Sequence, residues 1–245
     1  MQKTAVEIET PDGVADGYVF TPKGEGPFPG VIFLVDIGGI REANLGMAER
    51  LAGEGFVVAM PNPFYRTGRG QVLDFGAPRE ELMKRFGELA TPLTPQAVAK
   101  DESAFVDFLE RQAKVKQGAY GVVGYCFTGA HAMRAAAARP DKIAAAASFH
   151  GGRLLIDGPD SPHLLLPEIK ARLYFGHAVQ DQSMTAEQIL KFEDALGQWG
   201  GHFASETYEG ALHGWTVPGR ADIYNQPQAE LAHEKLTAFL HAALK

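Results

Sequence analysis

Residues Gly118–His131 read GAYGVVGYCFTGAH, and the rest of the chain is best interpreted from this stretch outward. A short apolar run ends at Gly124, and Cys126 follows two places later. The alanine-rich residues 127–138 then predict a helix, which Pro140 ends because proline cannot continue a helix. The pattern predicts a strand, a sharp turn and a helix, with a nucleophilic side chain in the turn.

Such a turn is a nucleophile elbow, and it requires small residues at defined positions on both sides of the nucleophile. Small residues two places before and two places after the nucleophile let the strand and the helix approach closely. Gly124 occupies the first place. Thr128 occupies the second and is larger than the usual glycine, which comes one place late as Gly129.

Length, composition and charge limit what this chain can be. The 245 residues are 45% hydrophobic, enough to bury one large core, and we expect a single domain over residues 1–245. The net charge of −7 argues against a nucleic-acid partner or an anionic membrane surface. A small molecule is the more natural substrate.

Cysteine usage and hydropathy indicate the cell compartment. The chain has one cysteine, so no disulfide can form within it, and it carries no basic-then-apolar leader or membrane-length apolar run. We therefore expect a cytoplasmic protein. A lone cysteine is usually a small buried hydrophobe, and it is the position of Cys126 that makes it a candidate nucleophile.

The order of predicted elements indicates the fold class. A hairpin opens the chain, and apolar strands then alternate with amphipathic helices, which is typical of a parallel sheet covered on both faces. We expect an α/β-hydrolase fold with a mostly parallel central sheet. The predicted strands are 4–9, 15–20, 30–35, 56–60, 118–124, 143–149, 173–176 and 203–208, and the predicted helices are 45–52, 79–89, 95–111, 127–138, 185–199 and 228–244.

Three reactive residues follow successive predicted strands. Cys126, Asp181 and His213 lie at carboxyl ends of strands, where ligands gather in parallel sheets, and the order nucleophile, acid, histidine is that of the α/β-hydrolases. Cys126 would attack a carbonyl, His213 would move the proton, and Asp181 would orient the imidazole. The backbone amides of Ile37 and Phe127 are expected to form the oxyanion hole.

Other residues compete for two of these roles. None of the other aspartates follows a buried strand as closely as Asp181, and only His213 lies in a glycine-rich loop after the last strand. The competing residues are Asp157, Asp160 and Asp194 for the acid, and His131, His150, His177 and His202 for the histidine. No histidine pair has the short helical spacing of a zinc site, and no phosphate-binding glycine loop is present, so we expect neither metal nor cofactor.

Four sequence segments together resemble the dienelactone hydrolase (carboxymethylenebutenolidase-like) family: GYCFTG at 124–129, VDIGG at 35–39, FHGG at 149–152 and YEGALHGW at 208–215. The resemblance runs nearly end to end. It implies a Cys-Asp-His triad that hydrolyses a lactone or ester through an acyl-cysteine, without metal or cofactor.

The resemblance also suggests residues around the nucleophile. Asp36 stands where the family has a glutamate that pairs with the resting cysteine, but Asp36 is one methylene shorter. Tyr125, His150 and Trp215 are further candidates for lining the substrate pocket or tuning the nucleophile.

One departure concerns charge recognition. Family members that act on dienelactone carry an arginine four places after the catalytic histidine, and here that place is Val217. Arg220 lies nearby, and Arg79 or Arg85 could supply a second positive group, although neither stands at a clearly matching position.

The leading hypothesis is thus a cysteine-dependent hydrolase of a small lactone or ester. Two alternatives stay open: a general carboxylesterase or thioesterase for neutral substrates, and a catalytically silent binding protein on the same fold. The sequence leaves open whether the protein is a monomer or a homodimer, and whether residues 64–90 form a lid.

Overall fold

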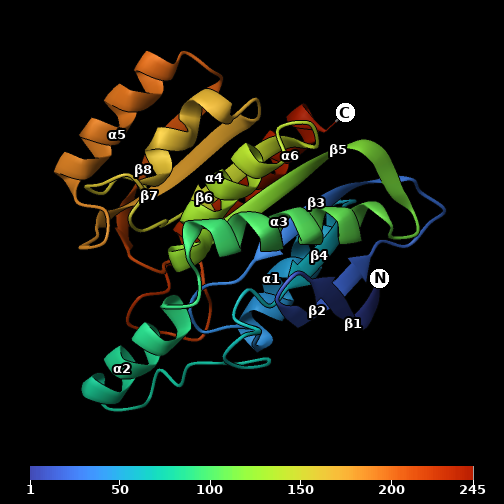
Figure 1. Ribbon diagram of the computed structural model, residues 1–245, viewed down its shortest axis with the longest axis horizontal. Helices are drawn as coiled ribbons and strands as arrows, with labels where there is room; N and C mark the ends of the chain where they lie inside the picture. Colours follow the sequence, from blue (N-terminus) through green and yellow to red (C-terminus); the bar gives the residue numbers. More distant parts are fainter. Residues whose placement is uncertain (245) are drawn as a thin grey trace.

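The computed structural model describes residues 1–244. Within them, strands and helices alternate after an opening hairpin, as expected (Figure 1). The strands are β1 (Gln2–Thr10), β2 (Gly13–Thr21), β3 (Phe28–Leu34), β4 (Val57–Pro61), β5 (Val115–Tyr125), β6 (Ile143–Phe149), β7 (Arg172–Gln180) and β8 (Phe203–Leu212). The helices are α1 (Glu42–Gly53), α2 (Arg79–Ala90), α3 (Pro95–Glu110), α4 (Gly129–Ala138), α5 (Ala186–Trp199) and α6 (Gln226–Ala243), with 3-10 segments at Cys126–Thr128 and Pro162–Glu168.

All of these strands form one sheet in the order β1-β2-β4-β3-β5-β6-β7-β8. The β1–β2 and β2–β4 pairs are antiparallel, and every pair from β4 to β8 is parallel. Strand β5, which leads into the elbow, therefore lies in the middle of the sheet, where both of its faces are covered. The expected α/β architecture with a mostly parallel sheet is confirmed.

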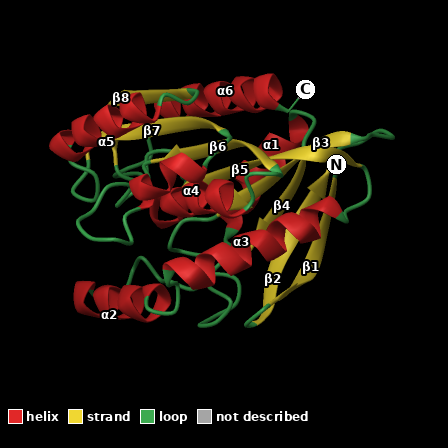
Figure 2. Cartoon of the chain, turned by 45° about the horizontal axis from the view of Figure 1, so that its top comes forward, coloured by secondary structure: helices red, strands yellow, loops and turns green. Residues whose placement is uncertain are grey.

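Helices cover both faces of the sheet. Apolar residues of α1 and α6 pack against one face, and those of α3, α4 and α5 pack against the other. Figure 2 shows α6 on one side of the sheet and α3 and α4 on the opposite side. Helix α3 begins as its sequence predicts: Thr94 Oγ1 accepts a hydrogen bond from Ala97 N at 3.2 Å, and Pro95 occupies the first helical position.

Several expected boundaries differ from the structure, and three of these differences concern the candidate site. β7 continues to Gln180 and β8 to Leu212, because the parallel pairing of these strands runs on through His177 and, after an irregularity, to the Gln180–Leu212 pair. The helix after the elbow begins at Gly129 rather than at residue 127, because residues 126–128 form a tighter 3-10 turn. Asp181 and His213 therefore follow directly on the ends of their strands.

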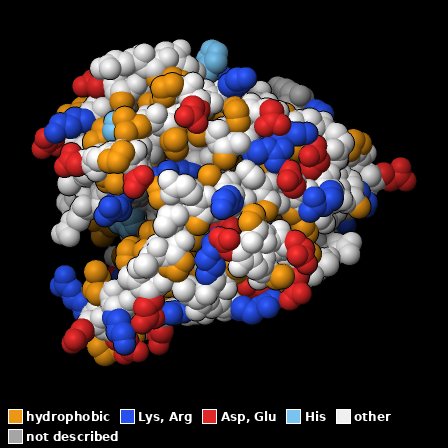
Figure 3. All heavy atoms as spheres, in the orientation of Figure 1, with side chains coloured by type: hydrophobic (Ala, Val, Ile, Leu, Met, Phe, Trp, Pro, Cys, Tyr) orange, Lys and Arg blue, Asp and Glu red, His pale blue; other side chains and the backbone are white. Residues whose placement is uncertain are grey.

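Helix α2 projects from the body of the molecule (Figure 1). Leu89 is its one fully buried residue within the described chain, and Arg85 anchors it by donating hydrogen bonds to the Val72 and Thr67 carbonyl oxygens. Phe86 packs edge-on against Phe127, next to the elbow, with ring centroids 5.7 Å apart. Figure 3 shows a hollow between α2 and the rest of the molecule, with hydrophobic side chains in it.

Candidate active site

The backbone at Cys126 has the strained form of a nucleophile elbow. Its φ is +57°, a left-handed conformation that residues with a side chain rarely adopt. A side chain at Gly124 would collide with the Thr128 carbonyl oxygen, so only glycine fits there. Gly129 is equally constrained, because an added Cβ would lie 2.5 Å from the Gly151 Cα. Gly129 thus provides the close approach that the sequence pattern places two residues after the nucleophile.

Thr128 has a separate purpose in the elbow. Its side chain is fully buried, and its hydroxyl accepts a hydrogen bond from Tyr125 N at 3.0 Å. The same hydroxyl lies 3.0 Å from the carbonyl oxygens of both Leu34 and Val35, to which it can donate. Thr128 therefore ties the nucleophile turn to the end of β3, and sequence reasoning registered it only as a departure from glycine.

The structure brings Cys126, His213 and Asp181 together. His213 Nε2 lies 3.0 Å from Cys126 Sγ, and His213 Nδ1 lies 2.6 Å from Asp181 Oδ2. The His213 side chain is 32% exposed and that of Asp181 only 3%, so the imidazole is accessible while the carboxylate is shielded behind it. We call these residues the Cys126–His213–Asp181 cluster.

Ser183 completes the surroundings of Asp181. Both its backbone N–H (2.8 Å) and its hydroxyl (2.6 Å) donate to Asp181 Oδ1, which leaves Oδ2 to face His213. Sequence reasoning missed this residue. The available signal was a serine two places after an aspartate at a strand end, a spacing at which hydrogen bonds back to the aspartate are common.

The electrostatics of the cluster favour a charged imidazole. Burial opposes the charge on His213, but the neighbouring Cys126 and the hydrogen bond that His213 donates to Asp181 outweigh this effect and raise the pKa of the imidazole to about 10. Burial likewise opposes the charge on Asp181, but the His213 hydrogen bond and charge, with help from Ser183, bring the pKa of that carboxyl below its usual value. Both shifts favour an ion pair across the 2.6 Å contact.

His150 and Trp215 lie behind His213. Each is almost completely buried, so neither offers surface to a substrate in this structure. The His150 ring packs edge-on against His213 at 5.3 Å and against Trp215 at 5.0 Å, and its Nε2 lies 2.7 Å from Thr216 Oγ1. Burial first, and then the charge of His213, keep the pKa of His150 well below its ordinary value.

Asp36 does not meet the expectation that it pairs with the cysteine. Its two carboxylate oxygens accept hydrogen bonds from Arg41 Nη1 (2.6 Å) and Nη2 (2.7 Å), and Gly38 N donates to one of them at 2.8 Å. Among residues 1–244, Asp36 forms no hydrogen bond with Cys126. A bidentate hydrogen bond from a guanidinium is one of the strongest interactions that a carboxylate can form. Arg41 therefore holds Asp36 in the loop that follows β3.

The backbone amides of Ile37 and Phe127, which are the expected oxyanion donors, belong to the two segments that the Thr128 hydroxyl connects. The Ile37 amide has no hydrogen-bond acceptor within residues 1–244, and the Phe127 amide lies in the first turn after the nucleophile, where helix amides lack an internal partner. Thr128 holds these two segments next to one another.

Aromatic side chains surround the same area. Phe127 packs against Phe86 at 5.7 Å and Phe64 at 6.0 Å. The guanidinium of Arg41 lies 5.2 Å from the centroid of the Phe75 ring, and that of Arg220 lies 5.7 Å from the same centroid. Aromatic rings therefore pack around the residue that follows the cysteine, and two guanidinium groups lie against the ring of Phe75.

Apart from His150, which packs against His213, the competing residues that follow lie elsewhere. His131 is on α4 beside Glu102, His177 is inside β7 and contacts Ser205 at 3.2 Å, and Asp194 is on α5. No three His, Cys, Asp or Glu side chains in the described chain form a group that could hold a metal ion. No helix between residues 1 and 244 is long and apolar enough to cross a membrane.

Comparison with known proteins identifies the family and agrees with the fold. The dienelactone hydrolase family model matches residues 15–244. A carboxymethylenebutenolidase of Rhodococcus opacus is 26% identical over 209 residues, which cover 83% of this chain and 76% of that protein. The dienelactone hydrolase structure from Anabaena variabilis superposes with a TM-score of 0.71 at 19% identity over 100% of this chain and 99% of that one. A dienelactone hydrolase-like promiscuous phosphotriesterase from metagenomic libraries gives 0.80 at 20% identity, covering all of both chains. With the family model matching almost the whole chain, this protein belongs to the dienelactone hydrolase family.

Proposed function

We propose that the protein hydrolyses a small lactone or carboxylic ester through an acyl-cysteine intermediate on Cys126. The observation that carries the proposal is the position of His213, 3.0 Å from the sulfur on one side and 2.6 Å from a shielded carboxylate on the other. A nucleophile, a proton carrier and an orienting acid in hydrogen-bond contact are what acyl transfer requires.

The first half of the reaction forms the acyl-cysteine. The Cys126 thiolate attacks the carbonyl carbon, and the carbonyl electron pair moves to oxygen, where the Ile37 and Phe127 amides stabilise the oxyanion. As the intermediate collapses, the C–O bond to the alcohol breaks and His213 Nε2 gives its proton to the leaving alkoxide. In a lactone the new hydroxyl stays tethered to the acyl group.

The second half releases the acid. Acylation removes the negative charge from the sulfur, and with it the main influence that raises the pKa of His213. The imidazole can then accept a proton from water, and the resulting hydroxide attacks the acyl carbonyl. Collapse of the second oxyanion expels the thiolate, and the proton remains on His213, which restores the starting pair.

Neutral esters form a second candidate substrate class. Arg79 makes no hydrogen bond or ion pair within residues 1–244, but the other arginines that could recognise a carboxylate already have partners: Arg41 pairs with Asp36, Arg85 with backbone carbonyls, and Arg220 with Asp222 at 2.9 Å. Val217, at the position of the family arginine, is buried. A substrate carboxylate would have to compete for each of these paired groups.

The test measures turnover and the intermediate together. On p-nitrophenyl acetate, Cys126→Ala and His213→Ala should lose nearly all activity, and intact-protein mass spectrometry of the unmodified chain should reveal one acetyl group on Cys126. Wild-type turnover in either variant would overturn the proposal. Comparing an anionic lactone with its methyl ester then separates the substrate classes, because a guanidinium-dependent site favours the anion by a large factor in kcat/KM.

A further inference from the structure

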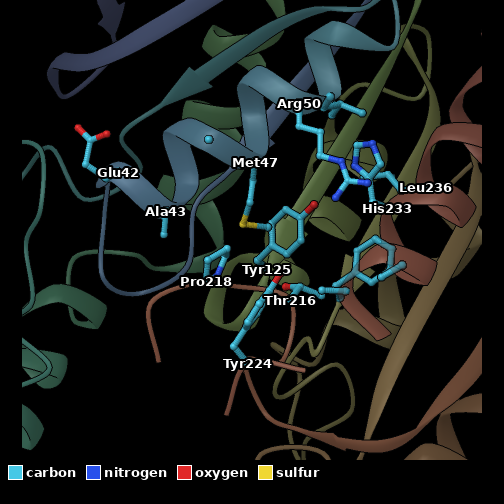
Figure 4. A pocket seen from close by; sticks show the side chains of 15 residues that line it. Glu42, Ala43, Met47, Arg50, Tyr125, Thr216, Pro218, Tyr224, His233 and Leu236 are labelled. Carbon is cyan, nitrogen blue, oxygen red and sulfur yellow. The ribbon is translucent and has the colours of Figure 1, made fainter. Parts of the chain in front are cut away.

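A cavity of about 300 Å³ lies between α1 and α6, and Cys126 is not among the residues that line it (Figure 4). Tyr125 and Phe149, at the ends of β5 and β6, contribute to its inner wall, and Met47 lies on its α1 side. Thr216 and Tyr224 close it from the loop that follows His213. None of the three cluster residues lines it, so it is separate from the site described above.

Tyr125 gives this cavity an unused polar group. Its side chain is 4% exposed, and its hydroxyl makes no hydrogen bond within residues 1–244. Figure 4 shows the ring in the wall of the cavity, with the hydroxyl directed toward α1. Because this hydroxyl has no protein partner and Tyr125 lines the cavity, a ligand group that bonds to it gains affinity. Burial raises the pKa of Tyr125, which keeps the phenol neutral and able to donate.

Thr216 supplies a second hydroxyl. Its Oγ1 is 2.7 Å from His150 Nε2, while His150 Nδ1 is buried with no partner in the described chain. An unpartnered lone pair is tolerated better than an unpartnered buried N–H, so His150 carries its hydrogen on Nε2 and donates it to Thr216. The hydrogen of the Thr216 hydroxyl is then free for an acceptor in the cavity.

The charges at the mouth of the cavity are mostly compensated. Arg50 of α1 pairs with Glu230 of α6, and His233 lies 3.4 Å from Glu54. Glu42 is exposed at the rim and disfavours anions. A cation or anion would have to displace an existing partner, whereas an uncharged molecule would not.

We propose that this cavity is a binding site for a small, uncharged, mainly apolar molecule with one hydroxyl or carbonyl group. Its volume is at the lower end of small-molecule pockets, and twice the size of an engineered cavity that holds benzene, so it suits one substituted aromatic ring. Apolar contacts with Phe149, Met47 and Tyr224 hold the ring, and Tyr125 or Thr216 bonds to the polar group.

The probe is 4-methylphenol, and the control compound is toluene, which lacks the hydroxyl. Binding of each to the intact protein is measured by titration calorimetry. Gly46 lines the cavity, and an added Cβ there meets no atom within 4 Å, so Gly46→Leu fills the space without displacing neighbours. We expect it to weaken 4-methylphenol binding at least tenfold. Gly53→Leu, on the same helix but outside the cavity, should leave binding unchanged.

Tyr125→Phe tests the polar contact separately. Loss of one neutral hydrogen bond should weaken 4-methylphenol about fivefold and leave toluene unaffected. Unfolding curves check that each variant folds, and Ala43→Leu, also on the wall, replaces Gly46→Leu if that variant does not fold. The proposal is overturned if saturable binding is absent, or if Gly46→Leu binds 4-methylphenol as the wild type does. It is also overturned if 4-methylphenol competes with ester substrate equally in all variants, because it then occupies the catalytic cleft. That result would leave the proposed hydrolase function intact.

Discussion

Thr128→Val probes how the elbow is held to the neighbouring strand. Valine has nearly the shape of threonine, so the substitution removes the hydroxyl and leaves the packing around it. In the wild type this hydroxyl accepts from Tyr125 N at 3.0 Å and can donate to the Leu34 or Val35 carbonyl oxygen at 3.0 Å. All of these groups are buried, and water cannot replace the hydroxyl.

The expected cost follows from the two hydrogen bonds. Leaving the Tyr125 N–H buried without an acceptor costs about 1–3 kcal/mol, and losing the donated bond costs about 1 kcal/mol more. We expect the free energy of unfolding to fall by about 2–4 kcal/mol. An unfolding entropy of about 2.1 cal/mol/K per residue gives about 0.5 kcal/mol/K for this chain, so Tm should fall by about 4–8 °C.

Thr237→Val is the matched control. The Thr237 hydroxyl on α6 is buried but has no hydrogen-bond partner among the described residues, so its removal should leave Tm unchanged or raise it slightly. Calorimetry on both variants measures the contrast directly. A Tm for Thr128→Val within about 1 °C of wild type, or an equal fall for Thr237→Val, would refute the reasoning.

Three further predictions concern charge. Asp181→Asn should lower kcat by about 10³–10⁴-fold with little change in KM, because the amide no longer stabilises the imidazolium; a loss below tenfold would remove Asp181 from the mechanism. Since the pKa of His213 is raised to about 10, the chemical shifts of its ring protons, measured by NMR, should vary little between about pH 6 and 8. A histidine in a model peptide should instead titrate near about pH 6.5, and matching behaviour of His213 would contradict the raised pKa. Burial raises the pKa of Glu102 well above its usual 4.5, so the folded protein keeps this carboxyl neutral where the unfolded chain ionises it. The cost appears as pH rises above about 4.5, and Glu102→Gln should raise Tm at about pH 8 but hardly at about pH 4; equal shifts at both would show that charge is not involved.

Much of the fold could be predicted because its elements are strongly patterned. The apolar run before Cys126 and the alanine-rich segment after it define a strand and a helix from local residues alone. The ends of β7 and β8 could not be located in this way, since they depend on pairing with each other. His177 and Gln180 extend the sheet by their register with Thr207 and Leu212 of β8, and neither is a residue type that by itself indicates a strand.

The same distinction between local pattern and long-range contact applies to the candidate active site. The positions of Cys126, Asp181 and His213 follow from topology, because carboxyl ends of parallel strands meet at one edge. The roles of Ser183 and Thr128 depend on where one hydroxyl points, which a sequence pattern does not specify. Such contacts form only after distant segments have been brought together.

Asp36 shows how a positional assignment can fail while the surrounding motif is right. Its place at the end of β3 matches the family acid, but Arg41, five residues later, offers two parallel N–H donors at 2.6 and 2.7 Å. With Asp36 occupied in this way, the partner that remains for the cysteine is His213, at 3.0 Å. In the proposed mechanism, the energy of substrate binding would then not be needed to displace a carboxylate from the sulfur. This arrangement supports the second candidate substrate class, the uncharged esters, which bring no carboxylate of their own to compete for Arg41.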